Sequence, residues 1–512
     1  MRRSNIKQWL VWGALGLMAA VPGWTQGLQN SGLQYLQTIS IPGWNPPGSP
    51  TANVDLMGYN PVTRMMYLAD RTNNGIDVID THANVVVGLV KMPPSSKQTT
   101  PATGPNGVIV AVNLQQLVVT DGLQSVIVWD LRAPQAAPDI YTFPSSLGTD
   151  TDGIAYDPIN QTVYVVTDNP PEYLIGINLA YKKIVSQTPL PVSADLIAFN
   201  PTDGKIYIAA EDADPAAPAT NANAGVFAYD PASGNPGTVS QVVKVGPPCP
   251  GHGIDIDPVS NVAVVGCFGG ANDTGDIMVN LSTGALLKTF TDVGGTDAVV
   301  FNPNNRRFYA AAGLNTATTS GCPNPKPGPF GTTVPIVGVM TGIGGVATLA
   351  GVGCTGGGHI IGVDPITNFV YAPVSQYPPD PNSTTTGSAG VVVLRDNTAP
   401  AQTLLTTPAS AALAPITGSA MAASGTVQFG LLGRRMHLTA ALAGIAGPGA
   451  WLTIPTTVTN EYVPCAVNTS NNTASCYEDL LGDPLIGATV TLSSDSGTGG
   501  VAVARAQITN IH

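Results

Sequence analysis

Short apolar segments recur along this chain, and each opens with a polar residue at the same place. In six of them a Pro stands six residues after the polar one, as in DLMGYNP, DGIAYDP and HGIDIDP. A seventh segment, NGVIVAVN, lacks the Pro but aligns with the others. The polar residues are Asp55, Asn106, Asp152, Asp195, His252, Asp297 and His359. Self-similarity of this kind indicates a repeat architecture.

Each repeat has the pattern of four short strands. The first ends in a turn such as NPVT or DPIN, in which Pro presets the backbone and Asn or Asp accepts a backbone hydrogen bond. A second strand such as TVYVVTD, a third such as GIDVID and a fourth such as VVVGLVKMP follow. Four strands every 45 to 60 residues or so predict β-propeller blades, here seven. Coincidental turns in a β-sandwich are the alternative, and seven in-register repeats argue against it.

The last repeat supplies only three strands before a Thr/Ala/Pro-rich stretch at 398–420. An isolated strand pattern, LQYLQTISIPG, lies ahead of the first repeat. Because a propeller must protect its open sheet edges, we predict that residues 33–41 complete the last blade. The segment TLLTTP at 403–408 is the rival candidate.

Beyond the repeats, VQFGLLG, AWLTIPTTVT and GATVTLSS read as short strands between Gly and Asn turns. We therefore assign a small β-sandwich-like module to the C-terminus. The predicted organisation is all-β: a signal peptide at 1–26, cut within 20–26; a seven-bladed propeller at 27–397; a linker at 398–420; and a C-terminal β module at 421–512.

The N-terminal pattern and the cysteines point to export. A basic start, MRRSNIK, precedes an apolar run at 8–21 that has signal-peptide length and is short for a membrane span. An N-terminal anchor is the alternative. An even number of cysteines suits an oxidising compartment, either secreted, periplasmic or at the cell surface. We predict disulfides 249–267, 322–354 and 465–476, formed by Cys249, Cys267, Cys322, Cys354, Cys465 and Cys476.

The sequence also disfavours several classes of protein. The net charge of −12 and the lack of a Lys/Arg cluster argue against nucleic-acid binding. There is no CxxC pair for a zinc ribbon, and no nucleophile elbow, P-loop or HExxH motif.

The Pro turn followed by YLAD or YVVTD and then GIDVID resembles the YVTN-type β-propeller repeat proteins, relatives of the NHL-repeat propellers. The resemblance covers residues 33–396. It implies the architecture but does not select an activity, because the family includes binding proteins, surface proteins and enzymes.

The seven aligned polar residues form a ring if the repeats close around an axis. The innermost strand of each blade would begin at the mouth of the central channel, with His252, Asp297, His359 and Asp55 consecutive. Carboxylates about 6 Å apart at an effective dielectric near 20 repel by about 3 kcal/mol per pair. Protonation, backbone hydrogen bonds or a bound cation would relieve this repulsion.

Two interpretations of the ring follow. His with carboxylate suits zinc, copper, iron or manganese, and an Asp/Asn subset suits calcium or magnesium, so the ring is a candidate site for a divalent cation of unassigned identity. In the alternative, the Asp residues accept backbone N–H groups and hold adjacent blades together. Acidic residues that end the second strands are assigned to loop capping; they are Asp70, Asp121, Asp168 and Glu211.

The functional hypotheses are three. The first is an exported binding or scaffold protein whose polar channel mouth accepts a small molecule or a protein. The second is a metal-dependent, lactonase-like lyase or hydrolase in which His252, Asp297 and His359 hold the cation. The third is a structural cell-surface protein. The longest loops, at 211–224, 313–334 and 375–389, are expected on the face that carries the ring.

Overall fold

A computed structural model describes most of the repeat region and the strands of the C-terminal module. The described residues are 33–44, 52–94, 104–148, 150–168, 171–211, 224–234, 236–244, 249–268, 275–303, 305–315, 326–328, 331–333, 335–342, 347–354, 358–377, 388–396, 409–416, 423–432, 435–445, 450–455, 460–468, 472–479, 488–494 and 501–510. The predicted signal peptide, the rival closing strand at 403–408 and Cys322 lie outside them.

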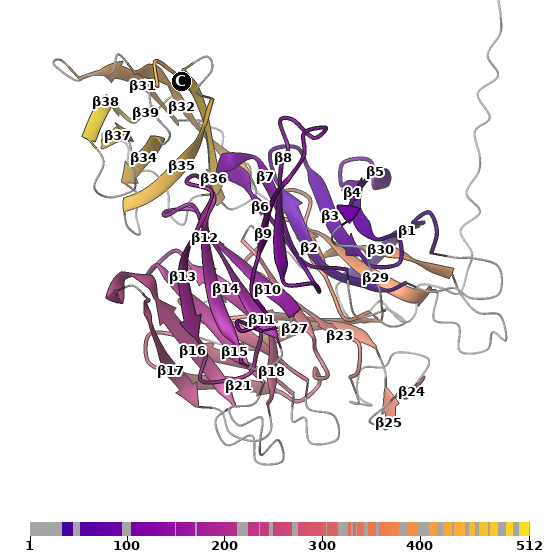
Figure 1. Cartoon of the computed structure of the whole chain (residues 1–512). Coiled ribbons are helices and arrows are strands. Elements are labelled where there is room, and N and C mark those ends of the chain that lie inside the picture. Colours follow the sequence, from indigo (N-terminus) through magenta and orange to yellow (C-terminus); the bar gives the residue numbers. More distant parts are fainter. Residues whose placement is uncertain are drawn as a thin grey trace, which may run out of the picture.

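Seven four-stranded antiparallel sheets follow one another along the chain (Figure 1). From the innermost strand outward, blade 1 consists of β2 (Val54–Asn60), β3 (Met65–Asp70), β4 (Gly75–Asp80) and β5 (Val85–Lys91), and blade 2 consists of β6 (Pro105–Ala111), β7 (Gln116–Asp121), β8 (Ser125–Asp130) and β9 (Asp139–Thr142). Blade 3 consists of β10 (Asp150–Asp157), β11 (Thr162–Asp168), β12 (Tyr173–Asn178) and β13 (Lys183–Pro189). Blade 4 consists of β14 (Ala194–Asn200), β15 (Lys205–Ala210), β16 (Gly225–Asp230) and β17 (Thr238–Lys244).

Blade 5 consists of β18 (Gly251–Asp257), β19 (Val262–Cys267), β20 (Asp276–Asn280) and β21 (Ala285–Phe290). Blade 6 consists of β22 (Ala298–Asn302), β23 (Arg307–Ala312), β26 (Ile336–Thr341) and β27 (Thr348–Cys354). Blade 7 consists of β28 (Gly362–Asp364), β29 (Phe369–Tyr377), β30 (Ser388–Asp396) and β1 (Leu33–Ile39). The innermost strands contact one another in sequence, β2 to β6 and onward to β28, and β28 contacts β2. The seven sheets therefore close into a circle, and the predicted propeller is confirmed.

Among the described residues, two 3-10 helices and a hairpin interrupt the blades. They are η2 (Val112–Leu114), η3 (Pro231–Ser233), and β24 (Lys326–Gly328) with β25 (Gly331–Thr333), which lies between the second and third strands of blade 6. Among the described residues, no helix is long and apolar enough to cross a membrane.

The N-terminal strand closes the propeller, as predicted. β1 pairs antiparallel with β30, from Leu33 opposite Asp396 to Ile39 opposite Val391. The segment buries its apolar side chains against blades 1, 6 and 7, including Ile41 and Trp44 at 1 % and 0 % exposure. The last blade therefore combines strands from both ends of the propeller sequence.

The turns after the first strands have the chemistry that the sequence predicts. The Asn60 side chain accepts hydrogen bonds from the N–H groups of Val62 and Thr63, and Asp157 does the same for Ile159 and Asn160. In every blade, the residue three places after the Pro position has a left-handed backbone; these residues are Arg64, Gln115, Gln161, Gly204, Asn261, Arg306 and Asn368. A tight turn of fixed geometry thus ends each innermost strand on the face away from the ring.

The C-terminal module is all-β, as expected. Its strands are β31 (Ala409–Pro415), β32 (Ser424–Leu432), β33 (Arg435–Ala443), β34 (Ala450–Pro455), β35 (Asn460–Asn468), β36 (Thr473–Asp479), β37 (Thr489–Ser494), β38 (Val501–Gln507) and β39 (Thr509–Asn510). They form one nine-stranded sheet, and pairing of β31 with both β32 and β38 closes it on itself. The predicted disulfide between Cys465 and Cys476 is confirmed and joins facing positions of β35 and β36.

One expected boundary is wrong. The linker predicted at 398–420 contains β31, whose alternating Ala411 and Leu413 are buried in the module. The Ala- and Pro-rich composition obscured this short strand, because small residues give a weak alternation of apolar and polar positions. The module forms a separate lobe whose β35 and β36 contact η2 of blade 2 (Figure 1).

A pair of buried carboxyl groups stands beside the closing segment. Asp70 accepts hydrogen bonds from the Trp44 indole N–H at 2.8 Å and from the Asn73 side chain at 2.6 Å. Burial raises the pKa of neighbouring Asp77 to about 9, and Asp70 adds to the shift. Asp77 is therefore protonated at neutral pH.

This proton predicts a dependence of stability on alkaline pH. The folded pKa of Asp77 exceeds its ordinary value of 3.8. The protonated Asp77 side chain therefore contributes fully to the stability of the folded protein below pH 3.8, and this contribution is lost as the pH rises through about 9. Asp77→Asn cannot ionise, so its melting temperature should fall less than that of the wild type between pH 7 and 9.5. Asp139→Asn, at an exposed ion pair with Lys182, is the matched control. Equal slopes in all three proteins would rule this account out.

Candidate functional site

The seven aligned polar residues occupy the same end of the innermost strands. In blades 1 to 5 each lies within a shift of strand register, between Val54 and Met57 in blade 1 and at the corresponding places in the others. Such β-bulges redirect a side chain out of the regular alternation. The regular alternation of side chains along a strand therefore does not apply at these ring positions.

Glycines beside the ring let the blades approach closely. A Cβ atom on Gly253, the residue after His252, would lie 2.5 Å from the carbonyl oxygen of Asp297 in the next blade. Gly153 has the same relation to the carbonyl oxygen of Asp195. The ring residues of neighbouring blades are thus held within side-chain reach of one another.

Four of the ring residues form a continuous hydrogen-bonded chain across blades 4 to 7. His252 Nδ1 donates to Asp195 Oδ2 at 2.8 Å and lies 3.5 Å from Asp297 Oδ1. His359 Nδ1 donates to Asp297 Oδ2 at 2.6 Å, and its Nε2 donates to the Val54 carbonyl at 3.1 Å. Both ring nitrogens of His359 face acceptors, so the imidazole is doubly protonated.

A third acid, Glu211, which is outside the ring prediction, completes this cluster. Glu211 directly follows β15, and its Oε1 accepts from His252 Nε2 at 3.0 Å. Its other oxygen lies 3.3 Å from the Ser193 hydroxyl. His252 is therefore held between carboxylates at both nitrogens, and its ring packs against Phe268 with centroids 4.5 Å apart.

The charges of the cluster support one another. Burial opposes the charged form of His252, but Asp195, Asp297 and Glu211 together raise its pKa well above the usual value. The pKa of His359 rises to about 9, because hydrogen bonding to Asp297 and its charge outweigh burial. Burial also opposes ionisation of Asp297, yet the two imidazoliums hold its pKa well below the ordinary value. The residues of this cluster thus form a set of ion pairs at neutral pH.

The two outer carboxyls of the cluster differ. Burial raises the pKa of Asp195 to about 6, although His252 opposes the shift. Burial also acts to raise the pKa of Glu211. The hydrogen bond and the charge of His252 outweigh this effect, so the pKa of Glu211 is lowered.

The other half of the ring is organised by Arg71. Its guanidinium forms an ion pair with Asp55 and donates to Asn106 Oδ1 at 3.1 and 2.5 Å. Asn106 in turn donates to the Thr151 carbonyl at 3.0 Å. Asp55, expected beside His359 in the His-containing half, is thus paired with arginine, and Asp195 takes its place in the hydrogen-bonded cluster.

Asp152 lies between the two halves. Burial and the negative charges of Asp55 and Asp195 raise its pKa well above the usual value. This shift favours the protonated form of the carboxyl group, and protonation is one of the three reliefs from carboxylate repulsion that the sequence suggests.

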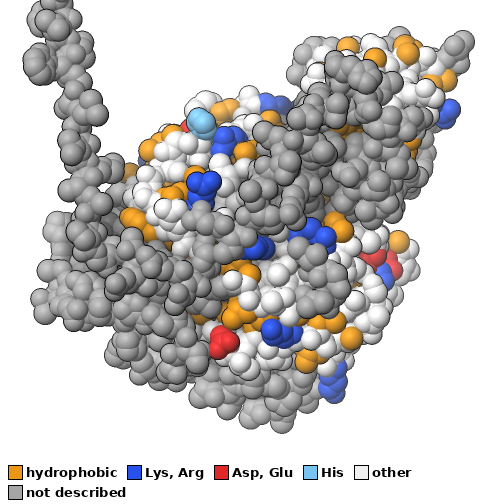
Figure 2. Space-filling model, turned by 180° about the vertical axis from the view of Figure 1, so that it is seen from behind, with side chains coloured by type: hydrophobic (Ala, Val, Ile, Leu, Met, Phe, Trp, Pro, Cys, Tyr) orange, Lys and Arg blue, Asp and Glu red, His pale blue; other side chains and the backbone are white. Residues whose placement is uncertain are grey.

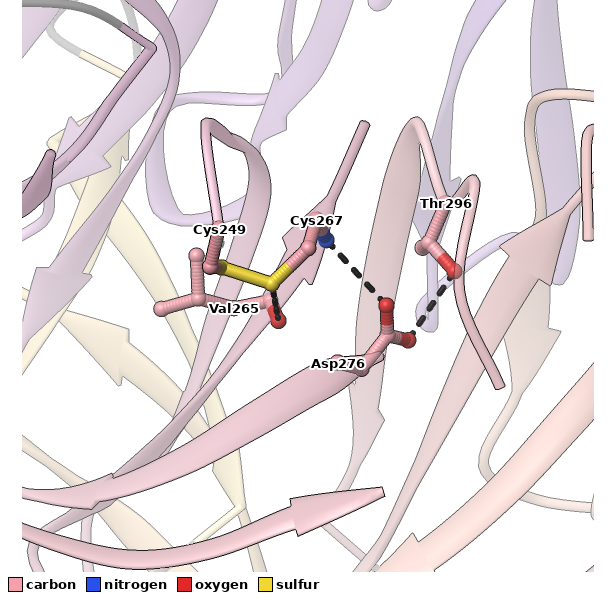
Figure 3. Close-up of a disulfide and its surroundings, with 5 residues drawn as sticks. All are labelled: Cys249, Val265, Cys267, Asp276 and Thr296. Atoms are coloured by element: carbon pink, nitrogen blue, oxygen red, sulfur yellow. Dashed lines mark hydrogen bonds between the residues drawn. A yellow bond between two sulfur atoms is a disulfide. The ribbon is translucent and has the colours of Figure 1, made fainter. Parts of the chain in front are cut away.

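A disulfide anchors the start of β18 beside His252. The predicted bond between Cys249 and Cys267 is confirmed and joins this segment to the end of β19 (Figure 3). The Cys267 N–H donates to Asp276 Oδ1 at 3.1 Å, and the Thr296 hydroxyl donates to Asp276 Oδ2 at 2.9 Å (Figure 3). Thr296 directly precedes Asp297, and Cys249 lies three residues before His252. This network therefore helps to position both His252 and Asp297.

The acids that end the second strands have divergent roles. Asp70 and Asp121 cap their own loops, as expected; Asp121 accepts from the N–H groups of Leu123 and Ser125. The Asp168 side chain lies outside the described residues. Glu211 reaches the ring instead. The sequence contains one sign of this difference: Glu211 stands where blades 1 to 3 have Asp, and its side chain is one methylene longer.

Three side chains meet the spatial requirement for a cation. One ligand atom each from Asp195, Glu211 and His252 lies within 4.8 Å of the other two. The ligands come from blades 4 and 5, whereas the set suggested by the sequence was His252, Asp297 and His359. In the structure Asp297 bridges the two histidines.

Other parts of the predicted mouth are only partly described. Residues 212–223, 316–325 and 378–387 of the long loops lie outside the described residues, as does the side chain of Cys354, the expected partner of Cys322. On the face shown in Figure 2, the described Lys, Arg, Asp and Glu side chains lie scattered among apolar and uncharged ones and form no basic patch.

Comparisons with known proteins leave the family open. No protein-family model matches the chain, and no curated protein matches it. Similar solved structures include a chain of the mitotic checkpoint complex, 10 % identical over 76 % of this chain and 99 % of that chain, with a TM-score of 0.49. Kuenenia stuttgartiensis hydrazine synthase is 13 % identical over 50 % of this chain and 80 % of that chain, with a TM-score of 0.41. The seven-bladed fold rests on the strand topology itself.

Proposed function

We propose that this protein is an exported, YVTN-type β-propeller that binds a divalent cation at its channel mouth and presents it to a small molecule or a protein. The observation that carries the proposal is the convergence of Asp195, Glu211 and His252 from two adjacent blades. The basic and apolar N-terminal pattern and the two described disulfides support export.

The donor set favours a transition-type metal. One imidazole nitrogen with two carboxylates suits zinc, manganese or iron better than calcium, which prefers an all-oxygen site. The second nitrogen of His252 can keep a carboxylate partner, and such a partner orients a metal-bound imidazole and increases its basicity. Asp297 is available for this role from the neighbouring blade.

Metal binding at this site must compete with a proton. A ligating histidine is neutral, whereas His252 is protonated in the absence of metal because its pKa is raised. Binding therefore releases a proton, and we expect the affinity for metal to increase as the pH rises from 6 to 8.

The test is calorimetric titration of the full chain with Zn²⁺ and Mn²⁺ at pH 7.5, together with elemental analysis of the purified protein. Glu211→Gln keeps the side-chain size but removes a charged ligand, so it should weaken binding at least about tenfold. Asp139→Asn removes an equal charge from an exposed ion pair remote in the fold and should bind as the wild type does. Unchanged affinity in Glu211→Gln, or no binding by the wild type, would refute the proposal.

A metal-dependent lyase or hydrolase ranks second, and His359 is the observation that favours it. Its side chain is 44 % exposed and is held protonated by Asp297, so a proton donor is linked to His252 of the cation site through Asp297. Metal-dependent turnover of an ester or lactone probe, lost in His359→Gln at unchanged metal content, would select the enzyme over the binding protein.

A further inference from the structure

A cavity of about 570 Å³ lies along the propeller axis below the ring. The innermost strands of six blades line it, with half-buried Leu56, Met57, Ile109 and Val300 among the lining side chains. At its far end lie the Pro turns of the blades and Val463 of β35, so the C-terminal module contributes to the wall. This volume and apolar lining are typical of sites for small organic molecules.

Asp255 interrupts the apolar lining. It is the only charged side chain among the residues that line the cavity. At the same place in the repeat the other blades have Gly58, Ile109, Ala155, Ala198, Val300 and Gly362. The turn and strand pattern of the repeat therefore does not require a carboxyl group here.

No Lys, Arg or His among the described residues forms an ion pair with Asp255. Its Oδ1 accepts from the Ile256 N–H at 2.8 Å, and its Oδ2 accepts from the Phe301 N–H at 2.6 Å. Burial raises the pKa of Asp255 to about 7, and these two hydrogen bonds oppose the shift. Each oxygen retains capacity for a further donor. The side chain thus offers a cation acceptor within an otherwise apolar cavity.

The mouth of the channel selects against anions. Apart from Asp152, whose raised pKa favours its neutral form, the ring residues together with Arg71 and Glu211 carry four carboxyl groups against three cationic groups: Asp55, Asp195, Glu211 and Asp297 against Arg71, His252 and His359. The whole chain has a net charge of −12. Both the cavity and its surroundings therefore favour a positively charged ligand over a carboxylate.

We propose that the axial cavity binds an apolar molecule with a single basic nitrogen, its hydrocarbon part against the strands of the opposite blades and its ammonium group at Asp255. The apolar lining provides affinity through desolvation of the hydrocarbon, and the carboxylate provides selectivity. This site is distinct from the cation site at the mouth, whose ligands do not line the cavity.

The test compares three probes of equal chain length, octylamine, 1-octanol and octanoate, by calorimetry with the full chain at pH 8. An alkylamine is cationic at this pH. Octylamine should bind at least about tenfold more tightly than 1-octanol, and octanoate should bind most weakly. Asp255→Asn keeps an acceptor oxygen without the charge, so it should reduce octylamine to the affinity of 1-octanol. Equal affinities of the three probes in the wild type, or an unchanged amine preference in Asp255→Asn, would overturn the proposal.

A second pair of variants tests the location. Ile109→Trp fills the cavity from blade 2 without touching Asp255 and should abolish binding of octylamine and 1-octanol. Ile140→Trp makes the same change at a 43 % exposed site on the outer strand of the same blade and should bind both normally. Normal binding by Ile109→Trp would place the probes elsewhere and refute the proposal. Zn²⁺ titration of the same variants separates this result from the metal site, because neither variant alters a metal ligand.

Discussion

Deletion of residues 33–44 is expected to leave no stable propeller. The segment contributes the outer strand of blade 7 and buries Leu33, Ile39, Ile41 and Trp44 almost completely. Burial of each such side chain is worth about 1.5–3 kcal/mol, so their joint loss removes about 6–12 kcal/mol. That amount is comparable to the total stability of a typical domain. The deletion also exposes the edge of β30, which favours aggregation.

The deletion is measured by thermal unfolding followed by circular dichroism, with size-exclusion chromatography for aggregation. Two substitutions separate packing from hydrogen bonding at the same place. Trp44→Ala should cost about 3–5 kcal/mol, whereas Trp44→Phe keeps most of the packing and loses mainly the bond to Asp70. A deletion variant that melts with the wild type would show that another segment closes blade 7.

His252→Ala is expected to have the largest effect of any substitution in the ring. It leaves Asp195, Glu211 and Asp297 facing one another without the imidazolium between them. Removing one partner of a buried ion pair costs about 3–5 kcal/mol, and the His252 side chain is 18 % exposed, so the lower part of this range applies. The free energy of unfolding in urea at pH 7 measures the loss.

A double variant identifies the cause. If unpaired carboxylates produce the loss, His252→Ala with Asp195→Asn should be more stable than His252→Ala alone, because the second substitution removes one of the repelling charges. Additive losses in the double variant would instead indicate that His252 stabilises by packing on Phe268.

The same cluster determines a pH dependence in the wild type. The folded pKa of His359 is about 9 against an ordinary value of 6.5, and the pKa of His252 is raised in the same direction. Their contribution to stability is therefore complete below about pH 6.5 and is lost as the pH rises through 9 and above. His252→Ala should show a smaller loss of stability than the wild type between pH 6.5 and 9.

The residue pattern alone predicts the blades, their number and the face on which the ring lies. Apolar alternation, Pro turns and a polar residue at a constant place are local features of each repeat. Such features can be recognised in the sequence without any information on distant contacts. The closing strand followed from the same regularity, since an incomplete last blade required a fourth strand from elsewhere. The linker was misread at β31, because small residues give a weak strand pattern.

Which polar residues act together depends on tertiary contacts between blades. Glu211 and Arg71 lie outside the aligned position, and their side chains reach the ring because of their length and the closeness of neighbouring blades. Arg71 pairs with Asp55, whereas Asp195 contacts His252, so the aspartate that meets a histidine depends on contacts between blades. Asp255 was one acid among several in the sequence, and closure of the seven blades placed it alone in an apolar cavity. Periodicity along the chain specifies where a side chain starts, whereas its partners and its charge depend on what the closed ring brings within a few ångströms.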